Sequence, residues 1–227
     1  MITIHHLEDS RSHRVIWLLE ELGAPYRIKR YDRDPDTGVG PKALYDIHPL
    51  GKSPMIEHGG EIIPETGAIF EYILDQQDLN HTLHPARGSA AARKFAYWLH
   101  YAEGSAMPPI LMKLVFSKLS ERAPGLAKPV VKGIARRAQD GFVDPRAMEH
   151  MDFWETSLAP TGWFVGNQFS AADIMMSFPL EAAASRFPMQ KYKTIQSFLN
   201  RCHERPAYQA ALERGGPYVY ARQKVSA

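Results

Sequence analysis

The sequence predicts an α/β domain followed by an all-α domain. Three observations lead to this fold class: strand and helix patterns alternate over the first third of the chain, the pattern breaks at 79–86, and helical periodicity continues beyond it. The chain has 227 residues, of which 44% are hydrophobic, so it has room for two small domains with a sizeable core. The expected division is a first domain at 1–78, a linker at 79–86 and a helical domain at 87–227.

The first domain begins with a strand, a helix and a second strand. The short segment 2–7 is rich in β-branched and apolar residues and predicts the first strand. Apolar residues then recur at helical spacing from Val15 to Leu22. Gly23 closes this helix, since glycine is favoured just beyond a helix end. Residues 26–31 alternate again and predict the second strand.

A hairpin and a helix complete the first domain. A short helix is expected at 42–47, and two strands at 55–57 and 61–63 flank the turn signal His58-Gly59-Gly60. Apolar residues at helical spacing then mark a helix that ends near Gln76. The predicted order is β-α-β, a short helix, then β-β-α.

The second domain is expected to be helical. A long amphipathic helix at 93–115 should bend at Pro108-Pro109, because proline removes backbone donors. A capping box is predicted from Ser170 and Asp173, with the Asp173 carboxylate accepting from the Ser170 N–H. The remaining expected helices are 144–158, 170–185, 194–203 and 207–212.

Composition excludes several classes of function. With 27 basic and 25 acidic residues, the formal charge is +2, which gives no reason to expect a nucleic acid or an anionic membrane as partner. The single cysteine, Cys202, allows neither an internal disulfide nor a thiolate zinc cluster. The ten histidines show no metal-ligand spacing, so no metal is expected. No signal peptide or membrane span is recognised, which predicts a cytoplasmic protein.

Two motifs predict a binding site for a small acidic peptide. Lys52-Ser53-Pro54 is an X-Pro step before a strand, which leaves the Ser53 N–H and C=O open to an extended peptide. Glu65-Thr66 lies where a helical pattern starts, and the free N–H groups of a helix start suit a carboxylate.

Together these features closely resemble the glutathione S-transferase family. The resemblance covers nearly the whole chain and depends on the order of elements, Lys52-Ser53-Pro54, Glu65-Thr66 and the block from Gly166 to Asp173. It implies a thioredoxin-like domain that binds glutathione as co-substrate, an all-helical domain that lines the acceptor site, and a homodimer. The serine-type, theta-like members of bacteria and fungi are the most similar, and a detoxifying role is implied.

The resemblance also implies roles for individual residues. Ser10 would hold the glutathione thiolate, and Ser12 would be the helix N-cap, although the two roles could be exchanged and both serines could simply cap the helix. Lys52 would lie near the glycyl carboxylate, with Lys42 a weaker candidate. Glu103 would reach the glutathione amine of the partner subunit, or would be a solvated acid. The acceptor pocket would contain four residues whose spacing equally suits a core: Tyr101, Met107, Met112 and Phe116.

The position of Ser10, just before the first helix, holds no cysteine, and this narrows the range of expected activities. Family members with cysteine there form mixed disulfides with glutathione, a step that serine does not perform. The predicted activity is addition of glutathione to a small apolar electrophile, with or without reduction of organic hydroperoxides. Two other classes stay open: a non-catalytic glutathione-binding or regulatory protein, and a glutathione-dependent isomerase or dehalogenase.

Overall fold

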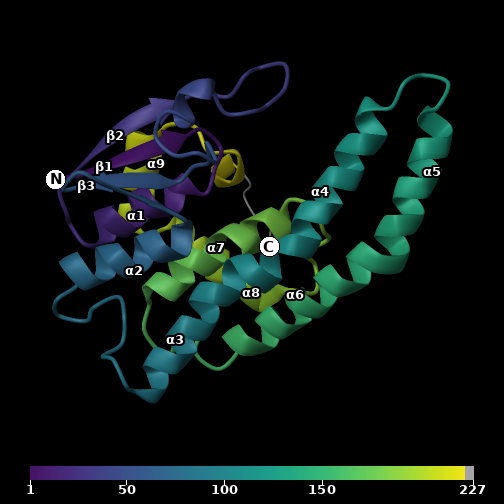
Figure 1. Ribbon diagram of the computed structural model, residues 1–227. Coiled ribbons are helices and arrows are strands. Elements are labelled where there is room, and N and C mark those ends of the chain that lie inside the picture. Colours follow the sequence, from purple (N-terminus) through teal and green to yellow (C-terminus); the bar gives the residue numbers. More distant parts are fainter. Residues whose placement is uncertain (223–227) are drawn as a thin grey trace.

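The computed structural model, which describes residues 1–222, contains a small mixed sheet and a larger set of helices (Figure 1). The strands are β1 (Ile2–Leu7), β2 (Tyr26–Tyr31), β3 (Met55–His58) and β4 (Glu61–Pro64), in the order β2-β1-β3-β4. β1 and β2 are parallel, and α1 (Ser12–Glu21) provides the crossover that a parallel pair requires. β3 pairs antiparallel with both β1 and β4.

The two faces of the sheet pack differently. On one face, α1 and α2 (Thr66–Gln77) bury their apolar sides in the main hydrophobic core. On the other face, Leu44 of a 3-10 turn (Lys42–Leu44) closes a small cluster with Leu7 and Met55. The short helix expected at 42–47 is therefore this single turn.

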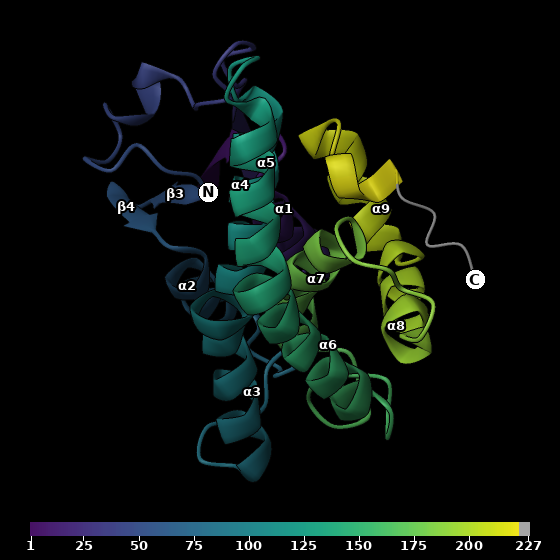
Figure 2. The same cartoon turned by 90° about the vertical axis from the view of Figure 1, so that its right-hand side faces the viewer.

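Seven α-helices follow in the described part of the chain. They are α3 (Ala90–Tyr101), α4 (Met107–Arg122), α5 (Lys128–Ala138), α6 (Asp144–Leu158), α7 (Ala171–Ala184), α8 (Lys193–His203) and α9 (Pro206–Gly215). α7 is buried along nearly its whole length, so the other helices pack around it. α1 lies between α2 and α9 (Figure 2), which joins the end of the helical domain to the sheet domain. None of the helices formed by residues 1–222 has both the length and the apolar character of a membrane span.

The expected helix at 93–115 is interrupted earlier than predicted. A π-helical turn, Ala102–Ala106, separates α3 from α4, and Pro108 and Pro109 lie in the first turn of α4. A proline ring clashes with the carbonyl four residues before it, and a wider turn gives that ring space. The interruption therefore precedes the prolines, and it places Glu103 in an opened turn.

α4 and α5 form a hairpin that projects beyond the other helices (Figure 1). The basic residues of 128–137 belong to α5, which is not among the individual helices expected from the sequence. Along α4, three apolar side chains at a spacing of four are about half exposed: Leu111 (47%), Val115 (55%) and Leu119 (50%).

Candidate active site

A cavity of about 360 Å³ lies between the sheet domain and the π-helical turn at 102–106. Its walls come from the start of α1, the loop before β3, the end of β4, the start of α2 and the π-helical turn. The lining residues are Arg11, His48, Leu50, Lys52, Ser53, Pro54, Pro64, Glu65, Thr66 and Glu103. The cavity thus brings together all six residues that the resemblance assigns to glutathione.

Ser53 presents its backbone, and not its hydroxyl, as the available polar group. Its hydroxyl donates to the His5 carbonyl at 2.8 Å and accepts from the Leu7 N–H at 3.2 Å, which fixes the loop to β1. The Ser53–Pro54 peptide bond is cis. Among the described residues, nothing hydrogen-bonds to the Ser53 backbone N–H or C=O. These two groups are therefore open to an extended peptide, as the sequence predicts.

The start of α2 forms the second polar wall. Glu65 is the N-cap residue, and its backbone has a φ of +69°, a conformation that costs free energy outside glycine. Its side chain makes no capping hydrogen bond, so within residues 1–222 the first N–H groups of α2 have no side-chain acceptor. Thr66 is buried beside them. A carboxylate of a ligand would complete this helix start.

Ser10 and Ser12 belong to a buried hydrogen-bond network. The Ser10 hydroxyl donates to the Leu7 carbonyl at 2.7 Å, and its oxygen accepts from the Ser12 N–H at 3.2 Å. His6 donates from Nε2 to the Gly215 carbonyl at 2.9 Å, which leaves Nδ1 to accept from the Ser12 hydroxyl at 2.7 Å. Burial lowers the pKa of His6, consistent with this neutral form. In this arrangement the Ser10 hydroxyl points inward, and Ser10 does not line the cavity.

The expected N-cap role of Ser12 is wrong. α1 begins at Ser12 itself, and the N-cap position is Arg11, which makes no side-chain capping bond. The Ser10 oxygen instead accepts the Ser12 N–H, so Ser10 is the serine that satisfies a donor at this helix start.

Arg11 and Arg14 share the Glu103 carboxylate, and sequence reasoning missed Arg11 as a cavity residue. Arg11 donates from Nε to both carboxylate oxygens at 3.1 and 2.9 Å, and Arg14 donates to one of them. Arg14 is fully buried and also donates to the Met175 carbonyl at 2.7 Å. Burial would raise the pKa of Glu103, but the two guanidinium groups outweigh burial and lower it. The only sequence signal for Arg11 was its position next to Ser10.

Both oxygens of Glu103 are therefore occupied within its own chain. The expected contact with the partner subunit's glutathione amine stays a prediction, and it would have to share a carboxylate that two arginines already use.

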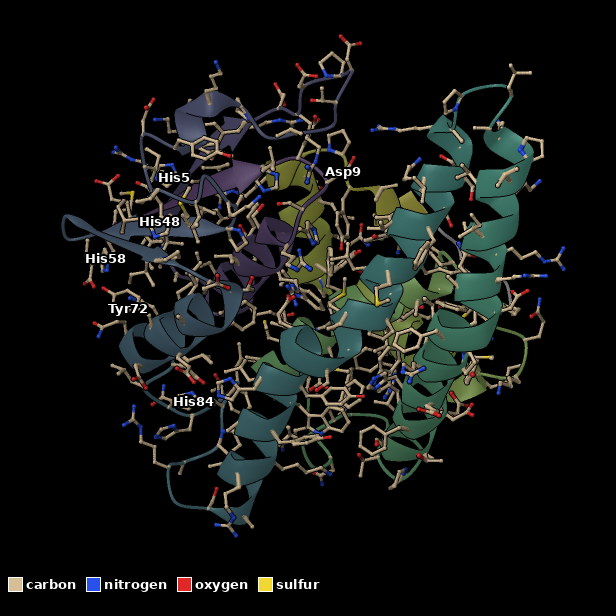
Figure 3. All side chains as sticks on the ribbon, turned by 45° about the vertical axis from the view of Figure 1, so that its right-hand side comes forward. His5, Asp9, His48, His58, Tyr72 and His84 are labelled. Atoms are coloured by element: carbon tan, nitrogen blue, oxygen red, sulfur yellow. The ribbon has the colours of Figure 1, made fainter. Side chains whose placement is uncertain are left out.

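The turn that carries Ser10 is held from two sides. Arg33 donates to the Glu8 carbonyl at 3.1 Å and to the Asp9 carbonyl at 3.3 Å. Asp9, with a φ of +46°, accepts from the Val219 N–H at 2.7 Å. Figure 3 shows Asp9 at the end of the sheet domain that faces the helices. The C-terminal segment therefore helps to position the start of α1.

The four residues expected in the acceptor pocket do not line this cavity. Tyr101 and Met107 are buried, and the Tyr101 hydroxyl accepts from the Trp154 indole N–H at 3.1 Å, so Tyr101 belongs to the core. Met112 and Phe116 are half-buried on α4. Only these last two retain exposed surface for an acceptor.

The labelled histidines lie along the sheet domain and the linker that follows it. Figure 3 shows His5, His48, His58 and His84 on separate segments of the fold. Within residues 1–222, no three His, Cys, Asp or Glu side chains are placed to hold a metal ion.

Comparison with known proteins agrees with the geometry of the fold. Residues 1–75 match the family model of the glutathione S-transferase N-terminal domain, and residues 125–215 match a model of the C-terminal domain. Glutathione S-transferase 3 of Schizosaccharomyces pombe is 34% identical over 216 residues, which cover 94% of this chain and 88% of that protein. Glutathione S-transferase 1 of Saccharomyces cerevisiae is 31% identical over 226 residues, covering 94% and 95%.

A solved structure of a glutathione S-transferase is also similar to this chain. The crystal structure of a glutathione S-transferase from Actinobacillus pleuropneumoniae has a TM-score of 0.79 and 30% identity, and the match covers 98% of this chain and 97% of that chain. The predicted fold class, a thioredoxin-like domain followed by a helical domain, is therefore confirmed. The two domain models and the relatives above 30% identity show that the chain belongs to the glutathione S-transferase family.

Proposed function

We propose that the protein is a serine-type, theta-like glutathione transferase of the cytoplasm that adds glutathione to small apolar electrophiles. One observation carries this proposal: a single cavity joins the open backbone of Ser53, the uncapped start of α2 and the turn at the start of α1. An extended peptide fits the open backbone of Ser53, and a carboxylate fits the uncapped start of α2. The turn at the start of α1 offers donors for an anion.

Glutathione would lie across the cavity with its two carboxylates apart. The γ-glutamyl carboxylate takes the N–H groups beside Glu65 and Thr66, and the cysteinyl backbone pairs with Ser53. Lys52 also lines the cavity and would neutralise the glycyl carboxylate. This orientation directs the cysteinyl side chain toward Ser10 and Arg11.

Activation of the thiol is the chemical task of the site. A free thiol has a pKa near 8.5, and lowering it by about two units requires about 2.7 kcal/mol of preferential thiolate stabilisation. The Ser10 hydroxyl supplies part of this when it turns from the Leu7 carbonyl to the sulfur. The Ser12 oxygen lies 3.2 Å from the same carbonyl, but its hydrogen is donated to His6, so the turn of Ser10 costs the Leu7 carbonyl its side-chain donor.

The transfer itself is a nucleophilic attack. The thiolate sulfur forms a bond to an electrophilic carbon, the leaving group departs with its bonding electron pair, and the thiol proton goes to solvent. Met112 and Phe116, the half-buried residues of the predicted set, would supply apolar surface for the electrophile.

Glu65→Ala tests the binding site. The variant should fold normally and bind glutathione more weakly by about 1.5–3 kcal/mol, or roughly ten- to 150-fold in Kd, because the Glu65 carboxylate would lose a charged hydrogen bond from the ammonium group of glutathione. The measurement is isothermal titration calorimetry. Glu61→Ala is the matched control, since it removes an exposed carboxylate four residues earlier, on β4, that does not line the cavity. Equal affinity of the Glu65 variant and wild type would reject this site.

We also propose that the protein is a homodimer and that the exposed stripe of α4 lies in its interface. A contiguous apolar face of this kind on a projecting hairpin is characteristic of protein contacts. Light scattering should give twice the 25.6 kDa mass of the chain at micromolar concentration. A double change, Val115→Glu with Leu119→Glu, should shift the mass toward the monomer, whereas Leu79→Glu, an exposed linker change, should not.

Two results would contradict the dimer proposal in different ways. A wild-type mass near that of one chain would exclude the dimer. An unchanged dimer in the double variant would place the interface on another face.

A further inference from the structure

Arg11 is the cationic side chain nearest in sequence to Ser10, and it faces the cavity into which Ser10 does not point. Its Nε is occupied by Glu103, but among the described residues its two terminal nitrogens have no hydrogen-bond partner. The side chain is about one-third exposed, at 35%, so the guanidinium is both fixed at one nitrogen and open at the others.

The charges around Glu103 leave a net positive charge at this wall. Two guanidinium groups share one carboxylate, and Arg14 is fully buried with its other bond to the Met175 carbonyl. The Arg14–Glu103 pair is neutral as a unit, so Arg11 contributes an uncompensated charge. Both guanidinium groups also lie over the Phe178 ring, at 5.2 and 5.0 Å from its centre, which restricts their movement.

We propose that Arg11 is a second thiolate contact, in which its terminal N–H groups donate to the sulfur of bound glutathione while Glu103 holds the guanidinium in place. This proposal rests on the proposed function and extends it. A guanidinium within hydrogen-bond reach favours the anion over the neutral thiol, whereas it gains little from the thiol itself. The Ser10 hydroxyl has to leave the Leu7 carbonyl before it can donate, but the Arg11 terminal nitrogens are already open.

Titration of bound glutathione tests this assignment. The thiolate absorbs in the ultraviolet, so its pKa is measured directly in the binary complex of enzyme and glutathione. Arg11→Gln should raise that pKa by about one to two units, which lowers the ratio of thiolate to thiol about ten- to a hundredfold. Arg11→Lys keeps the charge and should raise it less. Arg27→Gln, which removes one exposed charge from the far end of the sheet, is the control and should not change it.

Binding of S-methylglutathione separates the proposed role from a structural one. This thioether does not ionise, so its affinity should be the same in Arg11→Gln and wild type. If Arg11 only joins the two domains, Arg11→Gln will lower the melting temperature and leave the thiol pKa unchanged, which overturns the inference. If wild-type protein binds glutathione without lowering its thiol pKa, the transferase proposal fails, and this inference fails with it. If the pKa of the glutathione thiol is lowered to the same extent in wild type, Arg11→Gln and Arg11→Lys, the thiolate contact of Arg11 is rejected and the transferase proposal stands.

Discussion

We expect Ser10→Ala to lower kcat by about ten- to a thousandfold, the range for losing one preorganised donor to a developing or resident anion. The apparent pKa in the pH–rate profile should rise toward that of free thiol, because the thiolate has lost a hydrogen bond. Glutathione affinity should change less, since in the proposed binding mode Ser53, Glu65 and Thr66 hold most of the peptide. The measurement is the pH–rate profile with one aryl halide as acceptor.

Ser12→Ala is the matched control for this experiment. Ser12 donates to the buried His6 Nδ1, so the variant leaves a buried acceptor unpaired and should lose about 1–3 kcal/mol of unfolding free energy. Its kinetic pKa should stay at the wild-type value. A shift in Ser12→Ala but not in Ser10→Ala would reverse the two roles. No shift in either would leave activation to Arg11 and the backbone donors of α1.

Asp173→Ala should be the most destabilising of the proposed substitutions, with a loss of about 3–5 kcal/mol of unfolding free energy. The fully buried carboxylate accepts from the Phe164 N–H and the Ser170 N–H, both at 2.8 Å, and from the Ser170 hydroxyl at 2.9 Å. Its removal leaves two buried backbone donors without an acceptor. Denaturant unfolding measures the loss.

The glutathione affinity of the folded Asp173→Ala protein should equal that of wild type, because Asp173 does not line the cavity. Reduced affinity at unchanged stability would show instead that Asp173 belongs to the site.

The stability difference between wild type and Asp173→Asn should depend on pH. Burial raises the pKa of Asp173 from 3.8 to about 6, against the hydrogen bonds that lower it. Since the folded pKa lies above the unfolded one, the stabilisation is fully present below the unfolded pKa and is lost as pH rises through the folded pKa. Asparagine does not titrate, so the difference should shift by about 2–3 kcal/mol in its favour between about pH 4 and pH 7. A constant difference would contradict the raised pKa.

Local sequence patterns predicted most helices and strands, because these elements form through interactions between residues that are close in the sequence. The strand at 2–7, the helix at 144–158 and the hairpin around Gly59-Gly60 all appear at the expected places. The carboxylate of Asp173 accepts from the Ser170 N–H as the capping box requires. The same reasoning located Lys52-Ser53-Pro54 and Glu65-Thr66, which line the cavity, because the X-Pro step and the helix start are properties of a few consecutive residues.

The bend in the helix expected at 93–115 is a feature that local sequence patterns predicted only approximately. The two prolines predicted a bend at the right place within a few residues, but the π-helical turn that accommodates them lies before them. Its form depends on how α3 and α4 pack, and a list of residues does not contain that information.

The sequence by itself determined the order of elements and the two motifs that line the cavity, since each depends on short-range periodicity or on backbone chemistry, and the order and spacing of these features carried the resemblance to the family. Only the tertiary structure decided which way the side chains at the start of α1 point. Ser10 turns inward because the Leu7 carbonyl and Ser12 surround it, and Arg11 turns to the cavity because Glu103, 92 residues later, accepts its Nε. The Ser10 contacts are local in sequence, but the Arg11–Glu103 hydrogen bonds form only after the two domains pack, so no pattern within one segment predicts them.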